Sequence, residues 1–120
     1  MRISSAESVI MEALWRSSPL TSEAIIGEVG EPNGWTEGTV KQLISRLLKK
    51  KAIAAKPDGR RYLYTPLLAR RDYVEAESQG LLDRLFDGRL APLVTQFSEG
   101  GKLSDEDVAE LKALVERISK

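Results

Sequence analysis

The chain has 120 residues, of which 42% are hydrophobic, and its 18 basic side chains balance its 18 acidic ones. A chain of this length can bury one moderate core, or a domain of roughly 70 residues with an appendage. It contains no cysteine and no histidine, which excludes disulfides, nearly every transition-metal site and nucleophile–histidine catalysis. We therefore expect no metal, no other cofactor and no enzymatic activity.

The amino terminus shows no signal for export. No apolar segment follows Arg2, and no window reaches the roughly 20 apolar residues that a membrane span requires. We expect a complete, cytoplasmic protein that does not insert into a membrane.

Charge is distributed unevenly along the chain. Ten basic side chains lie between Lys41 and Arg71, against one acidic side chain, Asp58. Such a local excess is typical of a surface that binds a polyanion, and nucleic acid is the partner it indicates. A block of charge in a featureless loop is often only a solvated surface, but this one falls on predicted secondary structure.

Three helices are predicted in the first 51 residues. Residues 4–7 (SSAE) have the form of a capping box, and the helix behind them should run to about Trp15. Thr21 can cap a second, shorter helix, and Thr36 can cap a third that should end near Lys51.

A basic hairpin follows these helices. Residues 53–56 and 61–65 are predicted strands, joined by a turn at 57–59 (PDG), and Pro66 should end the second strand. Three helices and a basic hairpin within about 65 residues are the layout of a winged helix-turn-helix. We therefore predict a mainly α fold, with a winged-helix DNA-binding domain at residues 1–69.

The third helix should present a polar face to DNA, opposite its buried apolar stripe. Gln42 can pair with the adenine edge, and Arg46 can contact guanine or a phosphate, whereas the lysines and the hairpin arginines should contact phosphates. The predicted DNA-binding residues are Thr36, Gly38, Thr39, Lys41, Gln42, Ser45, Arg46 and Lys49 on the helix, and Lys56, Arg60 and Arg61 on the hairpin.

Three positions leave alternatives open. Gly38 either allows the backbone to approach the duplex closely or is a neutral substitution. Tyr62 and Tyr64 either stack on sugars or pack against the third helix, and both point to the same side of the hairpin.

Residues 70–120 are predicted to form three further helices: a long one to about residue 87, a short one over 90–97, and a last one capped by Ser104 and Asp107. Three helices of this size cannot bury all their apolar surface alone, so we expect this domain to pair with a second copy. The alternative is that it folds back on its own amino-terminal domain. The predicted dimerisation residues are Tyr73, Leu81, Leu82, Leu85, Phe86, Leu93, Val94, Phe97, Val108, Leu111, Leu114, Val115 and Ile118.

Several segments together resemble the BlaI/MecI/CopY family, which includes the penicillinase and methicillin-resistance repressors. The resemblance extends over essentially the whole chain. The matching segments are Ala6-Glu7, 11–15 (MEALW), 36–47 (TEGTVKQLISRL), 49–51 (KKK), 59–66 (GRRYLYTP) and 93–97 (LVTQF), together with the capped last helix.

This resemblance implies a dimeric repressor that binds an inverted-repeat operator through its winged heads. It also implies release by a membrane sensor-protease pathway, with cleavage between Gln96 and Phe97. Two features depart from the family: the copper-responsive branch has a cysteine metal hook that this chain lacks, and the penicillinase branch has Asn where this chain has Gln96.

The sequence thus predicts a homodimeric repressor that needs no ligand and blocks polymerase access from a palindromic operator. The alternative is a winged-helix module that binds an acidic protein partner.

Overall fold

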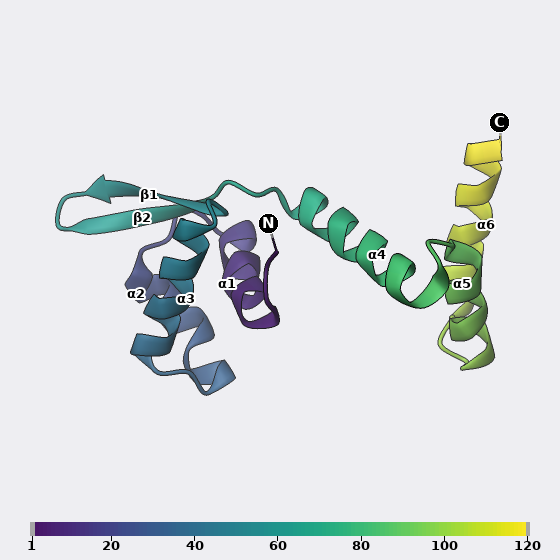
Figure 1. Cartoon of the computed structure of the whole chain (residues 1–120), viewed down its shortest axis with the longest axis horizontal. Coiled ribbons are helices and arrows are strands. Elements are labelled where there is room, and N and C mark those ends of the chain that lie inside the picture. The colour runs from purple at the N-terminus through teal and green to yellow at the C-terminus, as the bar shows by residue number, and fades with distance from the viewer. Residues whose placement is uncertain (1, 120) are drawn as a thin grey trace. The chain divides into compact units, whose positions relative to one another are not determined.

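The computed structural model describes residues 2–119 and divides the chain into two compact units. The first extends to Val74 and the second begins at Glu75, and Figure 1 shows their elements. The elements are α1 (Ser5–Arg16), α2 (Ser22–Val29), the short 3-10 helix η1 (Glu31–Asn33), α3 (Glu37–Lys49), β1 (Ile53–Asp58), β2 (Arg61–Pro66), α4 (Arg70–Phe86), α5 (Leu90–Glu99) and α6 (Asp105–Ser119). The predicted fold class, a mainly α winged helix-turn-helix followed by helices, is confirmed.

The helix starts follow the predicted caps. The amide of Glu7 donates to Ser4 Oγ at 3.1 Å and the amide of Ser4 donates to Glu7 Oε1 at 2.8 Å, which completes the capping box of α1. Thr21 and Thr36 each accept a hydrogen bond from the backbone amide three residues later. These side chains satisfy amides that a helix start otherwise leaves unpaired.

The wing, formed by β1 and β2, is longer than predicted, and its turn is shorter. The strands are antiparallel, and Asp58 pairs with Arg61, so only Gly59 and Arg60 lie between them. The prediction of a turn at 57–59 was wrong because Gly59, at φ 64°, lets the chain reverse within two residues. Pro57 instead pairs with Tyr62 inside the wing, and Pro66 is the last residue of β2.

The core of the first unit lies where α1, α2 and α3 meet (Figure 1). Every fully buried apolar side chain within residues 2–119 lies between Ile3 and Ile53. Trp15 and Trp35 pack on the edge of this core, and the Trp15 indole N–H donates to the carbonyl of Leu68 at 2.9 Å. Both tryptophans lie at helix borders and therefore have a packing role in the first unit.

The first turn of α4 belongs to the first unit. The rings of Tyr73 and Trp15 have centroids 5.5 Å apart, and Arg70 Nε donates to Glu12 Oε1 at 3.1 Å. The boundary at Val74 is therefore five residues later than the predicted one, and Tyr73 packs on the core of the first unit. Helical periodicity alone did not reveal this contact, because it depends on an aromatic partner 58 residues earlier.

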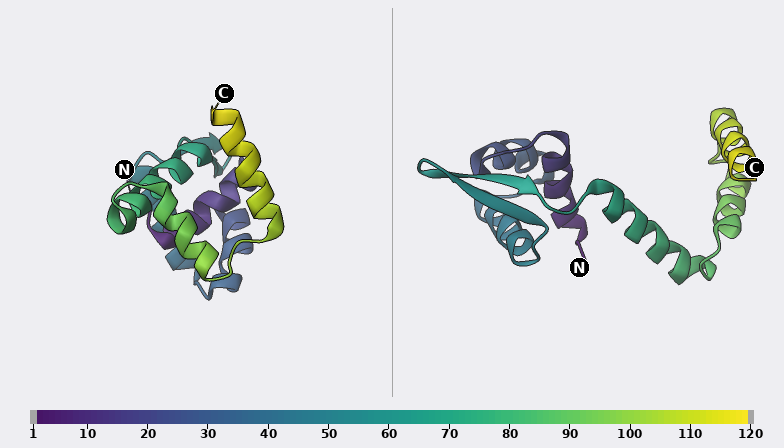
Figure 2. Two further views of the ribbon diagram at one scale, coloured as in Figure 1. Left: turned by 90° about the vertical axis from the view of Figure 1, so that its right-hand side faces the viewer. Right: turned by 90° about the horizontal axis from the view of Figure 1, so that it is seen from above.

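The second unit contains the rest of α4 with α5 and α6, and a short loop joins the last two helices (Figure 2). The predicted cap of α6 is present: the amide of Asp107 donates to Ser104 Oγ at 3.0 Å, and the amide of Ser104 donates to Asp107 Oδ2 at 3.2 Å. From Glu75 to Ile118 no residue is fully buried. This unit therefore has helices but no closed core of its own.

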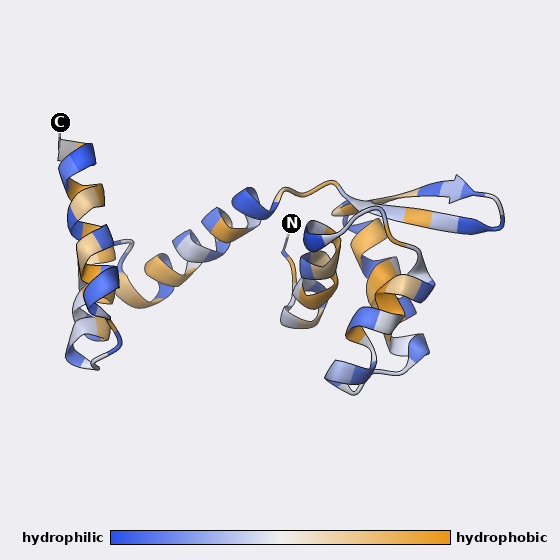
Figure 3. Cartoon of the chain, turned by 180° about the vertical axis from the view of Figure 1, so that it is seen from behind, coloured by the Kyte–Doolittle hydropathy of each residue, from blue (hydrophilic) through white to orange (hydrophobic). Residues whose placement is uncertain are grey.

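Figure 3 shows apolar residues along α1 and α3 in the first unit and a separate set along α5 and α6. Across residues 2–119, no helix combines the length and the apolar character needed to cross a membrane. The same residues contain no group of three acidic side chains placed to hold a metal ion.

Candidate nucleic-acid interface

Helix α3 has one buried face and one face in solvent. Val40, Leu43, Ile44 and Leu47 are buried against the core. The opposite face exposes six of the predicted DNA-binding residues: Gly38, Lys41, Gln42, Ser45, Arg46 and Lys49. A polar helix face of this kind offers hydrogen-bond donors and acceptors of a type that can read base edges in a major groove.

The first turn of α3 is held by threonine and glutamate side chains. Thr36 Oγ1 accepts from the amide of Thr39 and lies 3.2 Å from the Thr39 hydroxyl oxygen. Lys41 forms an ion pair with Glu37, with Nζ 2.8 Å from Oε1. The hydrogen bond lowers the pKa of the Glu37 carboxyl and raises the pKa of the Lys41 ammonium. A phosphate that binds Lys41 must therefore compete with Glu37, an acid that spacing i, i+4 could have identified from the sequence.

The middle and end of this face carry side chains free of internal partners. Gln42, Ser45, Arg46 and Lys49 are exposed, and none of their side chains bonds to another residue in the described part of the chain. Their donors and acceptors are therefore bonded only to solvent and remain available to a ligand.

Gly38 is not required by the packing around it. A Cβ added there would meet only Thr36 Oγ1, at 3.9 Å, which is ordinary van der Waals distance. The reason for glycine at this position therefore does not lie in this chain's own packing.

The wing places its three predicted DNA-binding residues in solvent. Lys56, Arg60 and Arg61 are all exposed, although Arg61 lies 3.9 Å from Asp58 in a weak ion pair. The two wing tyrosines differ: Tyr64 packs against the core, whereas Tyr62 is 53% exposed. The packing alternative therefore holds for Tyr64 but does not account for Tyr62.

Some of the ten basic residues from Lys41 to Arg71 are occupied inside the first unit. Besides Lys41 and Arg61, Lys50 pairs with Glu7 and Arg70 pairs with Glu12. Sequence counting alone missed this, because the two longer-range acids lie on α1, outside the segment that was counted. The free positive charge on α3 and the wing is therefore smaller than the sequence count.

Comparison with known proteins agrees with this arrangement. The family model described as penicillinase repressor matches residues 3–117. The chain belongs to the penicillinase repressor family. The penicillinase repressor of Bacillus licheniformis is 33% identical over 115 residues, which are 96% of this chain and 90% of that protein. The methicillin resistance regulatory protein MecI of Mammaliicoccus sciuri is 30% identical over 96% of this chain and 94% of its own length.

One similar structure has been solved with DNA bound. The solution structure of Bacillus licheniformis BlaI, in its monomeric form in complex with the blaP half-operator, matches this chain with a TM-score of 0.55 and 32% identity. The match covers 61% of this chain and 89% of that structure. The predicted family is thus confirmed, and with it a transcriptional repressor that binds DNA and is not an enzyme.

Proposed function

We propose that this chain is a homodimeric repressor whose two winged heads bind an inverted-repeat operator and block polymerase access, without a small-molecule ligand. The observation that carries the proposal is the exposed face of α3, where Gln42, Ser45, Arg46 and Lys49 have no internal partners in the described residues. The complex of the related BlaI with a half-operator supports it.

We assign base reading and phosphate binding to different side chains. Gln42 and Arg46 contact base edges, because an amide or a guanidinium can form paired hydrogen bonds with adenine or guanine. Lys49, Lys56, Arg60 and Arg61 contact phosphates, which fix register and affinity. Lys41 also contacts a phosphate once it leaves Glu37, while Thr36, Gly38, Thr39 and Ser45 line the approach of α3 to the groove.

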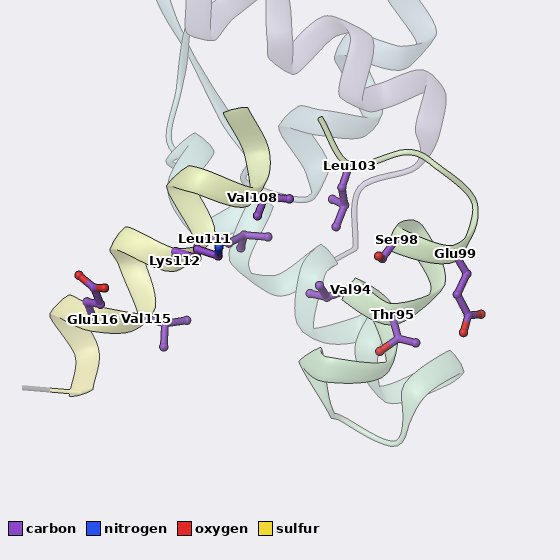
Figure 4. Close-up of a pocket in the computed structure, with 10 residues that line it drawn as sticks. All are labelled: Val94, Thr95, Ser98, Glu99, Leu103, Val108, Leu111, Lys112, Val115 and Glu116. Atoms are coloured by element: carbon purple, nitrogen blue, oxygen red, sulfur yellow. The ribbon is translucent and has the colours of Figure 1, made fainter. Parts of the chain in front are cut away.

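The second unit is the part of the chain that we assign to dimerisation. Two apolar hollows lie along α5 and α6, with volumes of about 710 and 850 Å³, and Figure 4 shows the side chains of Val94, Leu103, Val108 and Leu111 around the first. Both hollows are lined mainly by apolar side chains that remain open to solvent, and contiguous exposed apolar side chains of this kind mark surfaces at which proteins associate. A second copy offers a matching surface by symmetry, so we assign it as the occupant.

The proposed dimer contacts come from all three helices of this unit. Leu85, Phe97, Val108, Leu114, Val115 and Ile118 are exposed, and Leu81, Leu82, Phe86, Leu93, Val94 and Leu111 are half-buried. Burying such side chains contributes about 1.5 to 3 kcal/mol for each one fully covered.

We also propose that cleavage between Gln96 and Phe97, by a sensor-protease pathway, releases the repressor from DNA. Both residues are exposed on α5, and everything from Phe97 onward, including α6, would then be separated from the rest of the chain. A protein truncated after Gln96 should therefore remain folded in its first unit but sediment as a monomer. A truncated protein that still forms a dimer would contradict this route of release.

Selection from a random pool of DNA duplexes tests the main proposal. The wild-type protein should enrich a two-fold symmetric sequence, and footprinting should protect both half-sites. If the dimer neutralises about 8 phosphates, the logarithm of affinity should fall with the logarithm of salt with a slope of about −7. No enrichment and a flat salt response would overturn the proposal in favour of a module that binds an acidic protein.

A further inference from the structure

A junction of three residues connects the two elements that we assign to DNA contact. Helix α3 ends at Lys49, Lys50 is its C-cap, and β1 begins at Ile53. Lys51 adopts φ 62°, and Ala52 is buried, with its carbonyl accepting from the amides of Leu67 and Leu68. A contact that holds Lys50 in place therefore also positions the end of α3 and the start of the wing.

Lys50 is held by α1 and by the segment that precedes it. Its ammonium donates to Glu7 Oε1 at 2.5 Å and to the carbonyl of Arg2 at 2.8 Å. Its neighbours Lys49 and Lys51 are exposed. The three consecutive lysines therefore differ in role, because only the middle one is directed onto the protein itself.

Glu7 is the only fully buried charged side chain in the described residues, at 1% exposure. Its Oε1 accepts from Lys50 and from the amide of Ser4, whereas its Oε2 is buried with no hydrogen-bond partner in this part of the chain. Burial raises the pKa of the carboxyl, but the hydrogen bonds from Lys50 and Ser4 outweigh this effect and lower it overall. Glu7 is therefore a buried carboxylate paired with a cation.

A buried ion pair is weak evidence for added stability, because removing both charges from water costs about as much as their attraction returns. The unpaired Oε2 increases that cost. An apolar pair could fill the same space, whereas the ion pair adds directed contacts between α1, the amino-terminal segment and the junction.

We propose that Glu7 and Lys50 form a clamp that positions α3 and the wing relative to one another for binding the operator. The two residues are positioning residues, since Glu7 is buried and the Lys50 ammonium is bonded to Glu7 and to the carbonyl of Arg2. The proposal rests on the proposed function, because it assigns a specific geometry to the same DNA-binding surface. Its measurable consequence is discrimination between operator and random duplex, and not general attraction to DNA.

The test is the double variant E7Q/K50M, which removes both charges, keeps the side-chain lengths and leaves the net charge unchanged. We expect a folded dimer whose affinity for the selected operator falls about tenfold, while its affinity for random duplex and its salt slope stay at wild-type values. The single variant Lys50→Arg keeps Glu7 and a cationic donor at residue 50, so it should retain most of the wild-type discrimination.

The matched control is E12Q/R70M, which removes the ion pair between α1 and α4 in the same charge-neutral way. It should leave both affinities unchanged. Wild-type discrimination in E7Q/K50M would overturn the clamp, and so would a loss of operator binding that merely follows a loss of folded protein in circular dichroism. Failure of the wild-type protein to select any sequence would instead overturn the proposed function.

Discussion

The two units of this chain use the same kind of helical pattern with different results. In the first unit, α1, α2 and α3 bury their apolar stripes against one another, whereas the residues from Glu75 to Ile118 bury no side chain fully. Amphipathic periodicity therefore predicts helices in both units but does not tell which unit completes its own core. We therefore expect the first unit to fold alone and the second to need an associated surface.

The largest expected effect tests the core of the first unit. Leu47 is fully buried on α3, so Leu47→Ala should lower the free energy of unfolding by about 2 to 5 kcal/mol through lost burial and a cavity. Urea unfolding should show this loss at every protein concentration. A loss that disappears at high concentration would mean that the first unit also depends on association.

A charge on the second unit should break association. Leu114 is 42% exposed on α6 and lines the larger hollow, so Leu114→Asp should raise the dimer dissociation constant about 100-fold or more, because the carboxylate would be buried without a partner. Sedimentation equilibrium measures this change. The control is Ala109→Asp, at an exposed position of α6 that lines neither hollow, and it should remain dimeric.

Removing a base contact should have a smaller and more selective effect. Gln42→Ala should cost about 1 to 3 kcal/mol in operator binding and relax specificity at one position of each half-site. Fluorescence anisotropy with single-base operator variants measures both effects. An equal loss on operator and random duplex would show that Gln42 does not read a base.

Removing a phosphate contact should weaken binding to all sequences alike. Lys49→Ala should reduce the steepness of the salt dependence by about 1 for each subunit, without changing the ratio of specific to random binding. Affinities at several salt concentrations test this. A change in the specificity ratio would move Lys49 into the group of residues that read bases.

The smallest expected effect is on thermal stability at low pH. The pKa of Glu7 is lowered in the folded protein, so its stabilising contribution is fully present above the ordinary glutamate pKa of about 4.3 and is lost as the pH falls through the folded value. Thermal unfolding of the wild-type protein should lose a few degrees more than E7Q/K50M between pH 5 and pH 3. Parallel losses in both proteins would show that other carboxyls control acid stability.

Local signals predicted most of the first unit. Ser4, Thr21 and Thr36 mark the helix starts because a capping side chain bonds an amide only three residues away. Helical periodicity is also a local signal, and it correctly predicted which face of α3 is exposed. The assigned roles of its residues in DNA binding remain predictions.

Contacts between distant segments could not be predicted in this way. The pairing of Lys50 with Glu7 joins residues 43 positions apart, and the ring contact of Tyr73 with Trp15 joins residues 58 positions apart. Such contacts depend on how the elements pack, and a single sequence with no partner information does not specify them. The wing turn was misplaced for a local reason: Pro57 stays in the strand register, and the chain reverses at Gly59 and Arg60 instead.

Gly38 has a consequence for how related repressors can change. The position faces solvent early in α3, and the surrounding atoms leave room for a side chain, while alanine is favoured over glycine inside a helix by about 0.5 to 1 kcal/mol. New side chains at residue 38 can thus be introduced without disturbing the architecture. Under the proposed function, this is a position at which target preference can diversify, by evolution or by design, independently of the scaffold.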